Sequence, residues 1–158
     1  MYYHQCRHNL KYWSLSDYIG FGKSASSYID GVRFTNATDE GYGKGVLMEG
    51  DFLKNCKARN MIESSDAEFA NYKYSEFHVN DFMDTASEFV FLGLRRTAGI
   101  SFDEFEQLFG KRFADVYAGR RDEIEPFIES GDLIEDENGL RLSERGFDIS
   151  NKIMAIFV

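Results

Sequence analysis

Leu133-Ile134-Glu135-Asp136-Glu137-Asn138-Gly139-Leu140-Arg141-Leu142 stands near the end of this 158-residue chain. Its two ends carry apolar residues, and the dipeptide Asn138-Gly139 between them is a strong turn signal, so the stretch predicts a β-hairpin. Gly131 ends the segment before it, and Ser143 or Glu144 begins a closing helix. The apolar positions of that helix are Phe147, Ile149, Ile153 and Phe157.

Three helices are predicted upstream of this hairpin. Asn80 caps the first, which runs to Gly99; Ser101 caps the second, with Glu104 at the spacing of a capping box. The third lies between Phe113 and Ser130. Their apolar stripes are Phe82, Met83, Ala86, Phe89, Val90, Leu92 and Leu94, then Phe102, Phe105, Leu108 and Phe109, then Ile124, Phe127 and Ile128. Helix, helix, helix, hairpin, helix is the order of a winged-helix domain, expected over residues 80–158.

Residues 1–36 predict strand, turn and strand. The apolar run Tyr18–Phe21 is typical of a buried strand, and Asp30-Gly31 lies between alternating runs, which predicts a hairpin. Residues 37–79 form a variable linker, with a helix expected over Leu47–Ile62 and no clear period over 63–79. The predicted fold class is α+β.

Composition restricts the surroundings of the chain. No run of about 18 apolar residues is present, which excludes a membrane-spanning helix, and the first residues lack the features of a signal peptide. Two cysteines far apart in the sequence are typical of a cytoplasmic protein with free thiols. We therefore expect a cytoplasmic protein without a membrane span.

Charge argues against a nucleic-acid partner. The chain has a net charge of −9, and only residues 1–36 are net positive, at +2. From Phe113 to Gly139, where a winged helix would contact DNA, two arginines face nine acidic residues. A surface of that sign repels the phosphate backbone, so a DNA-binding regulator is the least favoured function.

Four ordered motifs carry a family resemblance. They are the H-N-x-x-Y-W box at His8–Trp13, the glycine-rich loop Gly20–Ser27, the helix Glu88–Arg95 and the Leu142–Gly146 segment. In this order they resemble the C-terminal third of radical-SAM proteins of the oxygen-independent coproporphyrinogen III oxidase type, and most of all the HemW-type heme chaperones. The resemblance implies that residues 1–36 are a remnant of the radical-SAM barrel.

The resemblance also implies ligands. It associates His8 with heme, a reasonable axial ligand, and Tyr12 and Trp13 offer flat faces to a tetrapyrrole. Ser24, Ala25 and Ser26 correspond to contacts of S-adenosylmethionine in an intact barrel. No residue is assigned a catalytic role, and no metal ligand is assigned.

One family feature is absent. The family holds a [4Fe-4S] cluster on a C-x-x-x-C-x-x-C motif, and Cys6 and Cys56 cannot provide it. We therefore expect a fragment of a heme-metabolism protein without radical-SAM activity of its own. Its partner would be heme, another protein, or the missing N-terminal barrel region.

Several alternatives stay open at this level. The box is also explained by core packing of Tyr12 and Trp13, and the Gly20–Ser27 loop by a tight turn after a strand. His4, Cys6 and His8 alternate, so on a strand they would share a face and could hold a metal. A P-loop is excluded: Gly22-Lys23-Ser24 resembles the end of that motif, but Asp17 stands where it needs glycine. An acidic protein-interaction module is the alternative function.

Overall fold

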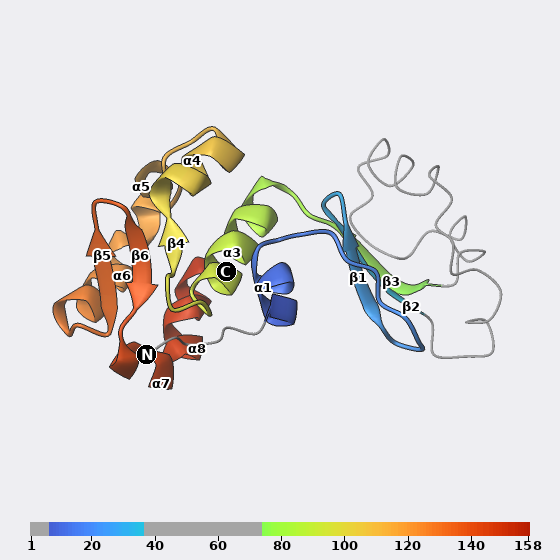
Figure 1. Ribbon diagram of the computed structural model, residues 1–158. Coiled ribbons are helices and arrows are strands. Elements are labelled where there is room, and N and C mark those ends of the chain that lie inside the picture. Colours follow the sequence, from blue (N-terminus) through green and yellow to red (C-terminus); the bar gives the residue numbers. More distant parts are fainter. Residues whose placement is uncertain (1–6, 37–73) are drawn as a thin grey trace. The chain divides into compact units, whose positions relative to one another are not determined.

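The computed structural model describes residues 7–36 and 74–158 (Figure 1). They form an α+β protein with two small antiparallel sheets. The chain divides into two compact units, one over Ser16–Asp81 and one that joins the residues up to Leu15 to Phe82–Val158. Within the described ranges, no helix has the length and apolar character that crossing a membrane requires. The helix expected over Leu47–Ile62 lies outside the described residues.

The first unit contains a three-stranded sheet in the order β1-β2-β3. Its strands are β1 (Ser26–Ile29), β2 (Val32–Asn36) and β3 (Tyr74–Val79). The predicted hairpin is confirmed: β1 pairs antiparallel with β2, and Asp30 and Gly31 form the turn with φ angles of 51° and 79°. Both central residues of such a turn need a positive φ, which Asp and Gly tolerate.

Two expectations for this unit are wrong. Tyr18 forms only an isolated bridge with Tyr28, and Ile19 and Phe21 are 51% and 79% exposed, so Tyr18–Phe21 is not a buried strand. Gly22, with a φ of 111°, turns the chain away before a ladder can form. The second concerns residues 63–79, where no clear period was found: Tyr74–Val79 forms strand β3, and its polar residues Ser75, Glu76 and His78 hide the apolar alternation that predicts a strand.

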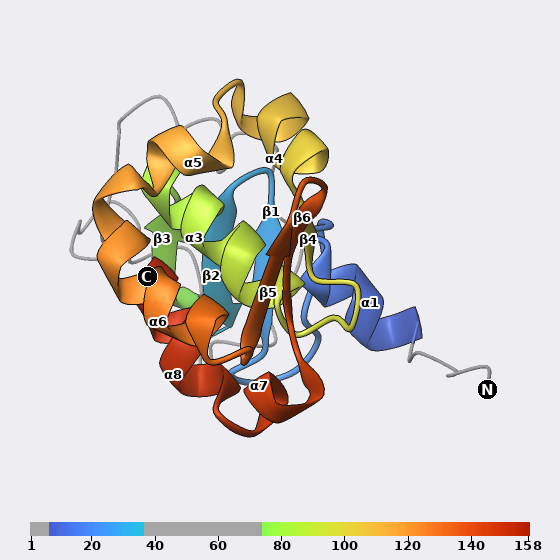
Figure 2. The same cartoon turned by 90° about the vertical axis from the view of Figure 1, so that its left-hand side faces the viewer.

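The second unit has the predicted order of helix, helix, helix, hairpin and helix (Figure 2). A short strand that the sequence did not reveal, β4 (Ile100–Ser101), pairs with the hairpin to give a sheet in the order β4-β6-β5. The other elements are α1 (Arg7–Trp13), α3 (Phe82–Gly93), α4 (Phe102–Phe109), α5 (Phe113–Val116), a 3-10 turn (Ala118–Arg120), α6 (Arg121–Glu129), β5 (Leu133–Asp136), β6 (Gly139–Leu142), α7 (Glu144–Asp148), α8 (Ser150–Met154) and a last 3-10 turn (Ala155–Phe157).

An aromatic cluster fills the core of the second unit. The fully buried ring of Phe105 lies 5.7 Å from Phe89, 4.5 Å from Phe109 and 5.6 Å from Phe113, measured between centroids. Tyr117 joins the cluster at 4.8 Å from Phe113. Edge-to-face and tilted pairs of this kind add to the free energy gained by burying each ring. The helices pack around these rings.

Several helix boundaries differ from the expected ones. Helix α3 ends at Gly93 rather than Gly99, because the chain must turn to bring Ile100 against Gly93, where a Cβ would overlap the isoleucine side chain. The third predicted helix is divided at Tyr117, whose ring turns into the core. The closing helix is divided at Ile149 into α7 and α8, and both Ile149 and Phe147 are exposed.

The second helix and the hairpin agree closely with the sequence. Ser101 caps α4 by accepting a hydrogen bond from the Glu104 backbone N–H at 3.3 Å, as predicted, although Leu108 is 61% exposed and not part of the buried face. In the hairpin, Glu137 and Asn138 form the loop. The predicted turn at Asn138-Gly139 is therefore displaced by one residue, because Gly139 pairs with Asp136 and Ser101 as the first residue of β6. Its lack of a side chain permits the close approach of the Ile100 carbonyl oxygen.

Candidate functional site

The H-N-x-x-Y-W box lies on helix α1, not on a strand. The helix begins at Arg7 and ends at Trp13, so His8 precedes Tyr12 by four residues, about one turn. The side chains of Tyr12 and Trp13 are partly buried, and α1 contacts α3 within the second unit. The proposed strand face of His4, Cys6 and His8 is therefore wrong at His8, and His4 and Cys6 lie outside the described residues.

The loop between Gly20 and Ser27 is a tight turn held by backbone hydrogen bonds. The Ala25 N–H donates to the Gly22 carbonyl at 3.3 Å, and the Ser24 N–H donates to the Asn36 carbonyl at 3.2 Å. Ser24 has a φ of 58°, which is uncommon for a residue other than glycine. The loop presents Ser24 and Ser26 to solvent, with Ala25 partly buried between them.

Asn36, at the end of β2, fixes this loop from inside the first unit. Its side-chain Nδ2 donates to the carbonyls of Gly20 at 3.0 Å and Gly22 at 2.9 Å, and the residue is only 6% exposed. Buried Ser27 adds a further bond, because its hydroxyl accepts from the Gly20 N–H at 3.0 Å. One carboxamide thereby satisfies two carbonyls that no strand ladder reaches.

Asn36 is the residue that sequence reasoning missed. An asparagine at the end of a predicted strand is usually explained as a turn former, and nothing in the local pattern indicates that its side chain reaches back over more than a dozen residues. The loop motif contains Gly20 and Gly22, whose carbonyls accept these hydrogen bonds. The donor, Asn36, can be identified only from the structure, in which the end of β2 lies beside the loop.

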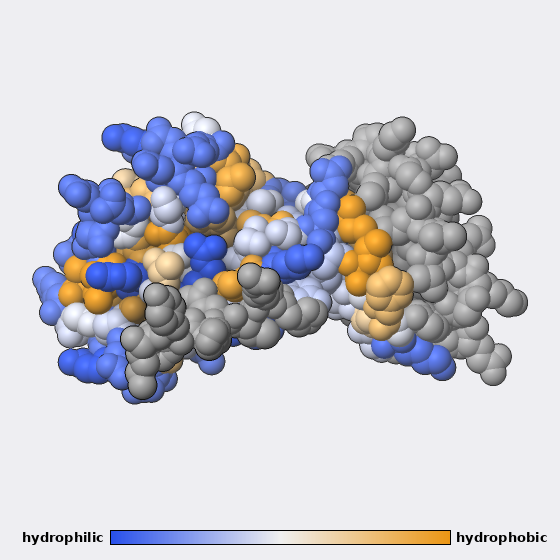
Figure 3. Space-filling view, in the orientation of Figure 1, coloured by the Kyte–Doolittle hydropathy of each residue, from blue (hydrophilic) through white to orange (hydrophobic). Residues whose placement is uncertain are grey.

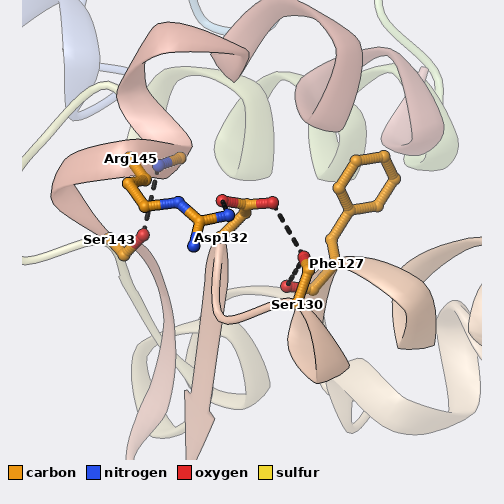
Figure 4. Close-up of polar contacts among 6 residues, drawn as sticks. Phe127, Ser130, Asp132, Ser143 and Arg145 are labelled. Carbon is orange, nitrogen blue, oxygen red and sulfur yellow. Dashed lines mark hydrogen bonds and ion pairs between the residues drawn. The ribbon is translucent and has the colours of Figure 1, made fainter.

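The Leu142–Gly146 motif forms a joint between the hairpin and α7 (Figure 4). Ser143 caps α7 by accepting from the Gly146 N–H at 3.1 Å, and its own N–H donates to the Asp132 carbonyl at 2.9 Å. Arg145 pairs with the Asp132 carboxylate at 3.0 Å, which the Ser130 hydroxyl also contacts at 2.7 Å. The motif therefore has a structural explanation.

Few of the described side chains have a shifted pKa, and none lies in a cluster that could bind a metal. Within the described ranges, no three His, Cys, Asp or Glu residues gather closely enough to hold a metal ion. Burial in the aromatic cluster raises the pKa of Tyr117 above its ordinary 10.0, slightly offset by the Ser87 hydroxyl. On the surface, the Arg112 guanidinium lowers the pKa of the Asp115 carboxyl through a bidentate hydrogen bond.

The two sequence motifs lie in different units. The box at His8–Trp13 belongs to the second unit and the loop Gly20–Ser27 to the first.

Comparison with known proteins gives this architecture a family context. Residues 83–149, which span α3 to the end of α7, match the family model of the HemN C-terminal domain. The chain carries a HemN C-terminal domain. The joint at Asp132 and Arg145 and the Ser101 cap both belong to it.

The relatives extend beyond the HemN C-terminal domain. Heme chaperone HemW of Bacillus subtilis is 28% identical over 98% of this chain and 35% of its own length, and HemW of Lactococcus lactis is 26% identical over 98% and 34%. The chain thus spans about a third of the length of these relatives. HemW of Synechocystis is 61% identical over 31 residues.

Among solved structures, coproporphyrinogen III oxidase HemN from Escherichia coli, a radical SAM enzyme, resembles this chain. The TM-score is 0.62 over 90% of this chain and 28% of that one, with 19% identity. This likeness shows a shared fold. The predicted family resemblance is therefore confirmed, while the ligand-binding roles of individual residues stay predictions.

Proposed function

We propose that this chain is the C-terminal part of a HemW-type protein of heme metabolism, and that it handles heme without radical-SAM activity of its own. The main support is the similarity to HemW heme chaperones over 98% of the chain, together with the HemN C-terminal domain. In this proposal residues 80–158 are a winged-helix-like module and residues 1–36 contribute to a barrel. The linker between them was expected over 37–79, but Tyr74–Val79 forms strand β3 beside β2 and is not part of it. The C-x-x-x-C-x-x-C motif needs three cysteines, and the chain has two.

Heme is the ligand that we propose for the box on α1. The imidazole of His8 would supply an axial ligand to the iron, and Tyr12, one turn later, and Trp13 would contact the macrocycle. Lys11 is exposed on the same short helix and offers a cation for a propionate. Helix α1 therefore supplies a ligand, two aromatic rings and a counter-charge within two turns.

A hemin titration of the full chain tests this proposal. We expect the Soret band of hemin to shift on binding, and His8→Ala to abolish the shift or weaken binding by about tenfold. The chain contains two other histidines, so His4→Ala and His78→Ala are matched controls and keep the parent spectrum. A His8→Ala protein with the parent spectrum and affinity would remove the ligand role. No heme response from any variant would favour the acidic protein-interaction module.

S-adenosylmethionine is the ligand that we propose for Ser24, Ala25 and Ser26 once the rest of a barrel is present. The support is that Asn36 fixes the loop through hydrogen bonds to the carbonyls of Gly20 and Gly22. Three residues on one loop enclose too little of a ligand to bind it alone, so isothermal titration of the chain with S-adenosylmethionine should give no measurable heat. Micromolar binding by this chain alone would contradict the need for the rest of a barrel, and micromolar binding that survives Ser24→Ala and Ser26→Ala would contradict the assignment to this loop.

A further inference from the structure

The HemN C-terminal domain has a hollow of about 180 Å³ that the proposed function does not use. It lies between α4, α5 and β5, and its lining residues are Phe102, Glu106, Arg112, Phe113, Ala114 and Glu135. Sites for small molecules and cofactors usually measure about 300–1,000 Å³. The hollow is therefore too small for a tetrapyrrole and matches the size of a single side chain.

Two aromatic rings line the inner side of the hollow. Phe102 and Phe113 stack with their centroids 5.1 Å apart and their planes 28° apart. Phe113 is buried in the core cluster, which fixes the position of the pair. The face of an aromatic ring attracts a cation, and most strongly a flat guanidinium that can stack on it.

Acidic side chains dominate the charge around the rings. Glu106 and Glu135 line the hollow directly. The Arg112 guanidinium binds Asp115 with two hydrogen bonds, at 2.9 and 2.8 Å, and that contact raises the pKa of Arg112. Because Arg112 already binds the Asp115 carboxylate, it is poorly placed to bind a further anion.

Arg121, a second arginine close to the hollow, is also already bound to carboxylates. Arg121 contacts Glu135 at 2.6 Å and Glu125 at 2.7 Å. Glu106 and Glu135 line the hollow together with Arg112, while Asp115, Glu125 and Arg121 belong to the same ion-paired cluster outside it. The cluster has four carboxylates and two guanidiniums, so it keeps a net negative charge. Hydrophilic side chains also form much of the outer surface of this unit on the face shown in Figure 3.

We propose that this hollow receives an arginine side chain from a basic segment of a protein partner. The guanidinium would stack on the partly exposed ring of Phe102, which itself covers the buried ring of Phe113, and donate hydrogen bonds to Glu106 and Glu135. A compact ammonium cannot do both at the same time. The nine acidic residues between Phe113 and Gly139 would steer a basic partner toward the hollow. The proposal does not depend on heme binding.

Amide chemical shifts of the full ¹⁵N-labelled chain test the proposal. The probe is the blocked peptide acetyl-Gly-Ser-Arg-Ser-Gly-amide, with lysine and citrulline versions as comparisons. The arginine peptide should shift the amides of Phe102, Glu106 and Phe113 with a dissociation constant on the order of 1 mM. Citrulline has a similar shape but no charge and should leave them unchanged, and lysine should bind at least about threefold more weakly.

Two variants with the same change in charge separate a site from general attraction. Glu106→Gln should weaken binding by about threefold or more, whereas Glu144→Gln, exposed at the start of α7 and outside the acidic stretch 113–139, should leave it unchanged. Equal weakening by both variants would show attraction to the acidic surface only. Equal shifts by the citrulline peptide, or tighter binding of lysine, would also overturn the proposal.

Discussion

The Arg145 guanidinium lies 3.0 Å from the Asp132 carboxylate, and the residue after it, Gly146, lies against the Asp132 backbone. The side chain of Arg145 and the backbone of Gly146 thus both contact Asp132, the residue just before β5. The ion pair is exposed on its Arg145 side, at 74%, so it is weak. The close backbone approach depends on Gly146, where a Cβ would overlap the Asp132 carbonyl oxygen.

Gly146 should therefore contribute more than Arg145 to the free energy of unfolding. Gly146→Ala must push α7 away from β5, and we expect it to lower the free energy of unfolding by about 2 kcal/mol or more. Arg145→Ala should lower it by less than about 1 kcal/mol. Urea unfolding followed by circular dichroism measures both.

Gly119→Ala provides the matched control for Gly146→Ala. Gly119 lies in the 3-10 turn before α6, and a Cβ there meets nothing within 4 Å. This variant should change the free energy of unfolding by less than about 0.5 kcal/mol. If Arg145→Ala destabilised the domain more than Gly146→Ala does, the ion pair would be the main element of the joint.

Asn36→Ala should loosen the Gly20–Ser27 loop. The substitution removes the Asn36 donor from the partly buried carbonyls of Gly20 and Gly22, the second of which keeps the Ala25 N–H, at a cost of about 1–3 kcal/mol. Hydrogen exchange at the amides of Ser24 and Ala25 should accelerate markedly. Ser26→Ala is the control, because its hydroxyl makes only an exposed 3.4 Å contact with Thr35. Unchanged exchange in Asn36→Ala would show that the backbone bonds alone hold the loop.

Alkaline pH should destabilise the second unit through Tyr117. Burial raises the pKa of Tyr117 in the folded chain above 10.0, so the unfolded chain loses this proton first as the pH rises. The stability from this group is complete below pH 10.0 and is lost from there upward as the pH passes through the folded pKa. Urea midpoints measured from pH 8 to pH 11 should fall less in Tyr117→Phe than in the parent. Parallel curves for the two proteins would exclude Tyr117 as the cause.

Local signals in the sequence predict much of this fold. Ser101 with Glu104, the Asp30-Gly31 turn and the alternating β5–β6 stretch are each explained by residues within a few positions of one another. Predictions failed where the backbone is shaped by distant residues. Tyr18–Phe21 has the apolar character of a strand but no ladder partner, and helix α3 ends where Ile100 must approach Gly93.

The residues alone predicted the order of the helices and the hairpin over 80–158 and the acidic character of the chain, because periodicity, capping and charge are local properties. Tertiary structure decided what each motif does within the fold. Only the pairing of β2 beside the glycine loop brings Asn36 to Gly20 and Gly22, and only the return of the hairpin brings Asp132 to Arg145. Such contacts join residues more than ten positions apart, and their partners follow from packing geometry rather than from any nearby pattern.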